Sequence, residues 1–95
     1  MTGLTAETRL LRKPQLLFEF LDGEVVIFDT SNEVFLSSND VGAHIWRLLE
    51  TPSSVSQICD AVMDEFDNPD RGWIVEDVSA LLSRMLEKGL IEIVD

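Results

Sequence analysis

One continuous stretch, residues 33–46, constrains the fold most, because it begins with the pattern of a strand and ends with the pattern of a helix. Val34, Phe35 and Leu36 supply the apolar and β-branched character of a strand. A polar corner follows at 37–40, and Asn39 is best placed there to cap a helix, since its side-chain oxygen can accept a free N–H of the first turn. The chain before this stretch reads as β and the chain after it as mostly α.

Two more strands are expected before the corner. Residues 16–21 and 24–29 are separated by Asp22-Gly23, a dipeptide typical of the type I′ turn in hairpins. Residues 30–32 form a second turn, so residues 33–37 become the third strand of an antiparallel meander. That third strand lies at an edge of the sheet.

Three helices are expected after the corner. The first ends at Thr51-Pro52, the second has the capping-box spacing of Ser54 and Gln57, and the third runs from 74 or 75 to 88, before Gly89. Residues 67–72 read as a loop, and residues 90–94 as a short last strand or an extended tail. The apolar stripes that the helices must bury are Val41, Ile45, Leu48 and Leu49 in the first, Val55, Ile58, Cys59, Val62, Met63 and Phe66 in the second, and Val75, Val78, Leu81, Leu82, Met85 and Leu86 in the third.

These elements predict an α+β fold in the order βββααα, with a winged-helix-like arrangement of three helices beside a three-stranded antiparallel sheet. The 95 residues suffice for one domain. We expect residues 16–95 to form it and residues 1–15 to be a flexible N-terminal arm.

The charge of the chain narrows its partners. Eighteen acidic residues face seven basic ones, for a net charge of −11. Nucleic acids and anionic membranes would be repelled by such a surface. The alternative is that the acidic residues simply keep a small protein soluble. The single cysteine, Cys59, cannot form an internal disulfide, and the chain shows neither a signal peptide nor a membrane span, so we expect a cytoplasmic protein.

The sequence offers no set of catalytic or metal-binding residues. His44 is the only histidine, and Cys59 lies on the apolar face of the second helix. The acidic residues at 64–70 depart from the spacing of an EF-hand loop. We therefore expect no enzyme, no cofactor and no metal.

A binding site is easier to find, because the third strand presents an unpaired edge. An extended peptide can add to such an edge, with main-chain hydrogen bonds giving affinity and side-chain pockets giving selection. The alternative is that the chain's own tail, residues 90–94, covers this edge. Both remain open at this point.

The residues also resemble a family. Residues 39–49, Asn-Asp-Val-Gly-Ala-His-Ile-Trp-Arg-Leu-Leu, resemble the Asn-x-x-Gly-Ala-x-Ile-Trp-x-Leu run of PqqD-like proteins. Three later segments are also similar to that family: the start of the second helix (55–58), Asp-Val-Ser-Ala-Leu-Leu in the third helix (77–82) and the closing Gly-Leu-Ile (89–91). The similarity keeps the same order and similar spacings over roughly residues 16–93. Ser38 departs from the pattern, since these relatives usually carry leucine there.

The resemblance implies a recognition element of ribosomally made, modified peptides, without chemistry of its own. It implies that the leader segment of a precursor peptide binds as an extra strand along the third strand, in the groove shared with the third helix, for delivery to a processing enzyme. The chain looks most like the stand-alone leader-binding proteins of lasso-peptide biosynthesis, which partner a leader peptidase. A pyrroloquinoline quinone chaperone that partners a radical SAM enzyme is the alternative.

Carried over by position, the resemblance gives eight peptide-binding residues. They are Val34, Phe35, Leu36 and Ser37 on the strand and Val75, Val78, Leu82 and Met85 on the helix. Each has a competing role in the core, because alternate strand residues point to opposite faces. Two other classes stay open: a winged-helix regulatory module, and a subunit that completes an enzyme. Homodimerisation is also open.

Overall fold

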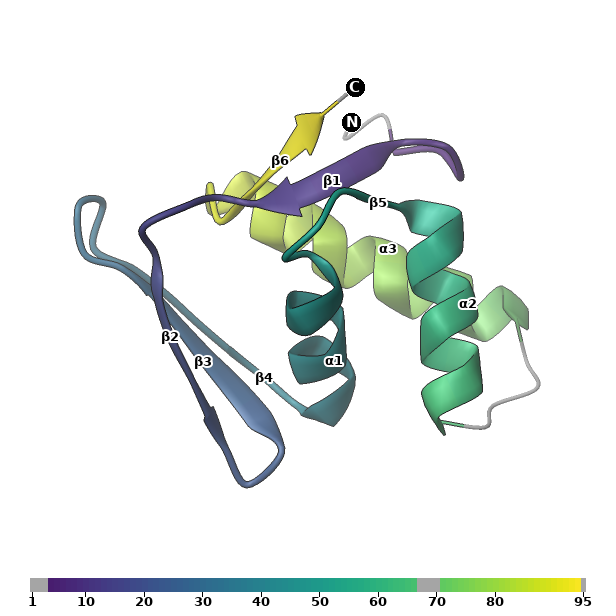
Figure 1. Cartoon of the computed structure of the whole chain (residues 1–95), viewed down its shortest axis with the longest axis horizontal. Helices are drawn as coiled ribbons and strands as arrows, with labels where there is room; N and C mark the ends of the chain where they lie inside the picture. The colour runs from purple at the N-terminus through teal and green to yellow at the C-terminus, as the bar shows by residue number, and fades with distance from the viewer. Residues whose placement is uncertain (1–3, 67–70, 95) are drawn as a thin grey trace.

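A computed structural model describes residues 4–66 and 71–94 of the chain (Figure 1). A three-stranded antiparallel sheet is followed by three helices, which confirms the predicted α+β fold. The elements are β1 (Arg9–Arg12), β2 (Leu17–Leu21), β3 (Glu24–Asp29), β4 (Val34–Ser38), α1 (Asp40–Leu48), β5 (Ser53–Ser54), α2 (Val55–Phe66), α3 (Arg71–Glu87) and β6 (Ile91–Val94).

The meander β2-β3-β4 has the predicted order and turns. Leu21 pairs with Glu24 around the two-residue turn, in which Asp22 and Gly23 both have positive φ (52° and 83°). This is the backbone that a type I′ turn requires. β3 then pairs with β4, so that β4 lies at one edge of this sheet.

A second sheet has the order β5-β1-β6 and includes residues 9–12 of the segment 1–15 that was expected to be a flexible arm; residues 1–3 lie outside the described residues. β1 is its central strand, and Arg9 pairs with Ser54 on one side and with Val94 on the other. Leu10 is fully buried in the core. A four-residue strand flanked by arginines gives almost no periodicity to detect, and its partners lie more than 40 residues away.

The ends of the helices follow the capping residues. The Asn39 side chain accepts a hydrogen bond from the Gly42 N–H at 3.2 Å, so the predicted cap of α1 is confirmed. The predicted capping box is present before α2: the Gln57 backbone N–H donates to the Ser54 hydroxyl at 3.0 Å, and the Ser54 backbone N–H donates to the Gln57 side-chain oxygen at 2.9 Å. Gly89 closes α3 with a φ of 73°. α3 itself begins at Arg71, three residues earlier than expected, and residues 67–70 of the predicted loop lie outside the described residues.

The meander lies on one side of α1 and α2 lies on the other (Figure 1). Two arginines connect the inner face of β2 to α1. The Arg12 guanidinium lies 4.6 Å from the centre of the Phe18 ring and donates to the Trp46 carbonyl, and the Arg47 guanidinium lies 4.1 Å from the centre of the Phe20 ring. The largest fully buried side chains are Trp46, Leu10, Ile27, Ile45, Leu49, Ile58, Leu82, Met85, Leu90 and Ile91. Among the described helices, none has the length and apolar content needed to cross a membrane.

Candidate functional site

β4 keeps one edge open within the described chain. It pairs with β3 alone, and the C-terminal segment that was a candidate to cover it instead pairs with β1 as β6. The two-residue turn makes Leu21 and Glu24 a hydrogen-bonded pair, and such pairs alternate along antiparallel strands. This alternation directs the backbone N–H and C=O groups of Phe35 and Ser37 away from β3. They therefore face the open edge.

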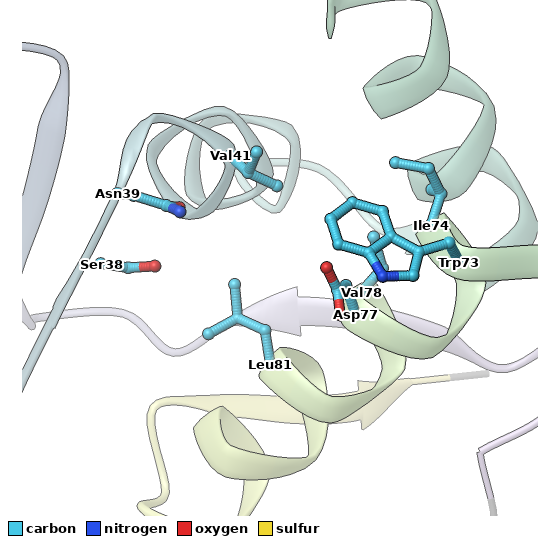
Figure 2. Close-up of a pocket in the computed structure, with 8 residues that line it drawn as sticks. All are labelled: Ser38, Asn39, Val41, Trp73, Ile74, Asp77, Val78 and Leu81. Atoms are coloured by element: carbon cyan, nitrogen blue, oxygen red, sulfur yellow. The ribbon is translucent and has the colours of Figure 1, made fainter. Parts of the chain in front are cut away.

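A groove of about 270 Å³ adjoins the end of β4 (Figure 2). One wall comes from the corner between β4 and α1, and the other from α3. Side chains of Trp73, Asp77 and Leu81 face the corner across this space. The lining residues are Ser38, Asn39, Val41, Trp73, Ile74, Asp77, Val78 and Leu81. An extended segment added to β4 would continue directly over this groove.

Gly42 brings the corner and α3 close together. A Cβ on Gly42 would overlap the Cβ and Oγ of Ser38 and come within 3.4 Å of a Leu81 methyl. Gly42 is buried in the first turn of α1. The missing side chain of Gly42 therefore lets Ser38 and Leu81, two residues that line the groove, approach α1 closely.

The structure divides the four predicted strand residues between two faces. Leu36 is buried and Val34 is half-buried, and both lie on the inner face of the sheet. Phe35 and Ser37 are exposed on the outer face, Phe35 at 52%. All four lie along the open edge, so a guest strand would meet one pair on each of its faces.

The four predicted helix residues do not share one location. Val78 lines the groove. Leu82 and Met85 are fully buried in the core. Val75 lines a different cavity, of about 140 Å³, between α2, α3 and the segment at residues 4–6. Of the four, only Val78 lines the groove beside β4, and its contact with a peptide stays a prediction.

Three residues of α3 that line the groove were not predicted: Trp73, Asp77 and Leu81. They recur every four residues and so form one stripe along the helix. Trp73 is 55% exposed although it is the largest side chain of the helix. A tryptophan outside the apolar stripe of an amphipathic helix was the signal available in the sequence.

A second apolar surface lies on the outer face of the meander. Leu17, Phe28 and Phe35 are paired directly across β2, β3 and β4 and so form one row, which we call the outer row. Their side chains are 60, 42 and 52% exposed, and the Phe28 and Phe35 rings lie 5.2 Å apart. Adjacent exposed large apolar side chains of this kind are typical of protein interaction surfaces.

The turn that leads into β4 is held by Asp29. Its carboxylate accepts hydrogen bonds from the Ser31 and Asn32 N–H groups and from the Asn32 side chain, at 3.1, 3.3 and 2.8 Å. The side-chain hydrogen bond from Asn32, assisted by these backbone bonds, lowers the pKa of Asp29 below its ordinary value of 3.8. The charged form of Asp29 thus stabilises the hairpin that presents β4.

This lowered pKa predicts a pH dependence of stability. A depressed pKa in the folded protein gives stability that is present above the ordinary value of 3.8 and is lost as the pH falls through the folded value. The free energy of unfolding of the wild type should therefore fall more steeply below about pH 4 than that of Asp29→Asn. Urea unfolding from pH 7 to pH 2.5 checks this. Parallel pH profiles for the two proteins would contradict the role of Asp29.

The remaining candidates for chemistry lie in packed positions. The His44 ring makes an edge contact with Phe66 at 5.9 Å, and Cys59 is buried in the core. Among the residues that the structure describes, no three His, Cys, Asp or Glu side chains are grouped as metal ligands. The described site is thus built from an open strand edge and an apolar groove.

Comparison with known proteins identifies the family. The family model described as coenzyme PQQ synthesis protein D (PqqD) matches residues 24–91. The chain therefore belongs to the PqqD family, and the resemblance seen in the sequence is confirmed. A search of curated proteins found no match.

A solved structure supports the same relationship. The structure of TbiB1 in complex with the TbiA(beta) leader peptide is similar to this chain, with a TM-score of 0.75 and 27% sequence identity. The match covers 86% of this chain and 94% of TbiB1. The two proteins thus share nearly the whole fold.

Proposed function

We propose that this protein binds the leader segment of a ribosomally synthesised precursor peptide as an added β-strand and delivers it to a processing enzyme. The open edge of β4 beside the groove of α3 is the observation that carries this proposal. The similarity of this chain to TbiB1, whose structure was solved with a leader peptide, supports the proposal. A strand added at Phe35 and Ser37 would gain main-chain hydrogen bonds, and its side chains would reach the groove.

We assign the protein to lasso-peptide biosynthesis, on its resemblance to stand-alone leader-binding proteins and its similarity to TbiB1. The competing role is a peptide chaperone for a radical SAM enzyme, as in pyrroloquinoline quinone biosynthesis, which the description of the family model favours. In both roles the chain is an accessory protein rather than an enzyme. Both place it in the cytoplasm, where precursor peptides are made.

A winged-helix regulatory module has less support. Such a module needs a basic face toward nucleic acid. The exposed charges of α3 include Arg84 together with Glu76, Asp77 and Glu87, on a chain with a net charge of −11. We therefore expect no binding to nucleic acid.

A titration tests leader binding. The protein is added to a fluorescein-labelled synthetic leader of the precursor peptide encoded beside its gene, and anisotropy is followed. Saturable binding with micromolar or tighter affinity is expected, and a scrambled leader of the same composition should not bind. Equal binding of both peptides, or of neither, would contradict the proposal.

The outer row provides a surface for the enzyme that receives the peptide. Its side chains lie on the outer face of the meander, whereas the groove lies on the inner side of β4. Phe28 belongs to the central strand, away from the open edge. Phe28→Asp should therefore leave leader affinity within about twofold and weaken association with the enzyme at least tenfold. Loss of an aromatic side chain at the centre of an interface typically costs about 2 kcal/mol or more, which corresponds to more than tenfold in affinity.

Co-purification and leader titration of Phe28→Asp measure these two effects separately. Glu24→Asp is a matched control, because Glu24 lies on the same face of the same strand at its exposed end. Unchanged association of Phe28→Asp with the peptidase or radical SAM enzyme would exclude the outer row as the enzyme-binding surface. A homodimer through this row would instead be revealed by a concentration-dependent mass in light scattering.

A further inference from the structure

We infer that the groove selects a lysine or arginine side chain of the bound peptide, which lies over Trp73 and pairs with Asp77. This inference rests on the proposed function, because it concerns what the groove reads in a guest that adds to β4. It names a position of the leader and the residue class that fills it.

The lining of the groove combines apolar walls with a single charge. Val41, Ile74, Val78 and Leu81 provide the walls, and Asp77 is the only ionisable side chain among the residues that line it. Figure 2 shows the Asp77 carboxylate beside the Trp73 ring, at the end of the groove away from Ser38. An aromatic face next to a carboxylate is suited to hold a cation, since the ring attracts it from one side and the carboxylate from another.

Among the side chains that the structure describes, Asp77 makes no ion pair. In the free protein Asp77 is exposed, so water solvates its carboxylate. A partner for Asp77 is therefore needed only once a peptide displaces that water.

Covering the groove makes Asp77 selective. A guest strand along β4 would exclude water from the carboxylate, and a carboxylate left without a donor is penalised strongly. A lysine or arginine side chain removes this penalty, and its apolar stem packs along the walls of the groove. A neutral donor would satisfy the hydrogen bond but would gain nothing from the net charge of −11 or from the face of Trp73.

The acidity of the whole protein attracts any basic peptide, so the test must separate this general effect from Asp77 itself. Glu76 is the matched control: it is adjacent on the same helix and exposed, and it does not line the groove. Asp77→Asn and Glu76→Gln remove the same charge. Only the first should change recognition at the groove.

The experiment is a double-mutant cycle on the labelled synthetic leader at 150 mM salt. Each lysine or arginine of the leader is replaced in turn by glutamine. Asp77→Asn should weaken binding of the unchanged leader about tenfold, the effect of losing a hydrogen bond to a charged group, and Glu76→Gln less than twofold. One leader substitution should cost the wild type about tenfold and Asp77→Asn almost nothing.

Three results would overturn the inference while leaving leader binding intact: Asp77→Asn binding as tightly as Glu76→Gln, no leader substitution coupled to Asp77, or tight binding of a leader that has no lysine or arginine. Failure of the wild type to bind the leader at all would overturn the proposed function, and this inference with it. The outcomes therefore distinguish the two.

Intrinsic fluorescence gives an independent readout. The chain has two tryptophans: Trp46 is fully buried, and Trp73 is 55% exposed. Leader binding should shift the emission of the wild type to shorter wavelength, because Trp73 becomes covered. The shift should be absent in Trp73→Phe. A shift of equal size in Trp73→Phe would locate the guest away from Trp73 and overturn the inference.

Discussion

Ser37→Pro should weaken leader binding about thirtyfold or more while leaving the protein folded. The Ser37 N–H faces the open edge of β4, and proline is tolerated at an edge where this N–H is not needed by the sheet. A guest strand would lose one main-chain hydrogen bond and leave its own carbonyl unpaired, for a cost of about 2–4 kcal/mol, or about thirtyfold or more in affinity. Anisotropy titration measures the loss.

Ser37→Ala is the control for this substitution. The Ser37 side chain is exposed, so its removal should change the free energy of unfolding by no more than about 0.5 kcal/mol and leader affinity by no more than about twofold. Thermal unfolding followed by circular dichroism shows whether Ser37→Pro is folded. A folded Ser37→Pro protein that binds the leader as tightly as Ser37→Ala would exclude β4 as the strand to which the peptide adds.

Gly42→Ala should destabilise the domain more than an ordinary glycine-to-alanine change. In an exposed helix this change is favourable by about 1 kcal/mol. Here the new Cβ would overlap the Ser38 side chain and crowd Leu81. Overpacking of this kind costs about 1–3 kcal/mol, and each kcal/mol lowers the Tm of a domain of this size by about 4–8 °C.

Ser38→Gly should rescue Gly42→Ala, because it removes both of the Ser38 atoms that the new Cβ overlaps. The single variant Ser38→Gly measures the intrinsic cost of the second change. The free energies of the two single variants should therefore sum to a larger loss than that of the double variant, by about 1 kcal/mol or more. Additive losses would show that the Ser38–Gly42 approach does not constrain the fold.

The features that could be predicted from the sequence are those that short-range chemistry determines. Asp22-Gly23 defines the hairpin because few other residues accept its positive φ values. Asn39, Ser54 and Gln57 mark helix starts through hydrogen bonds to residues three positions away. The open edge of β4 follows from the order of the meander.

The features that were missed depend on tertiary packing. β1 is defined by pairing with β5 and β6, not by its own four residues. The stripe of α3 is wide enough that periodicity does not separate the side chains that face the core, such as Leu82 and Met85, from those that face the groove. Val75 and Trp73 are only two residues apart yet lie beside different cavities.

Ser38 illustrates what the structure adds to the family pattern. Its small side chain lines the groove and lies against Gly42, at the position where the sequence resemblance led us to expect leucine. A serine at this position leaves room in the groove that a leucine would fill. We expect the shape of the corner to contribute to the choice of peptide.

Amide hydrogen exchange tests the addition of a strand to β4 most directly. In the free protein, the N–H groups of Phe35 and Ser37 face the open edge and should exchange rapidly. On addition of saturating leader peptide, the exchange of these two amides should slow at least tenfold, because each becomes hydrogen-bonded to the guest strand. Leader binding that leaves both amides unprotected would contradict the proposal that the peptide binds as a β-strand along β4.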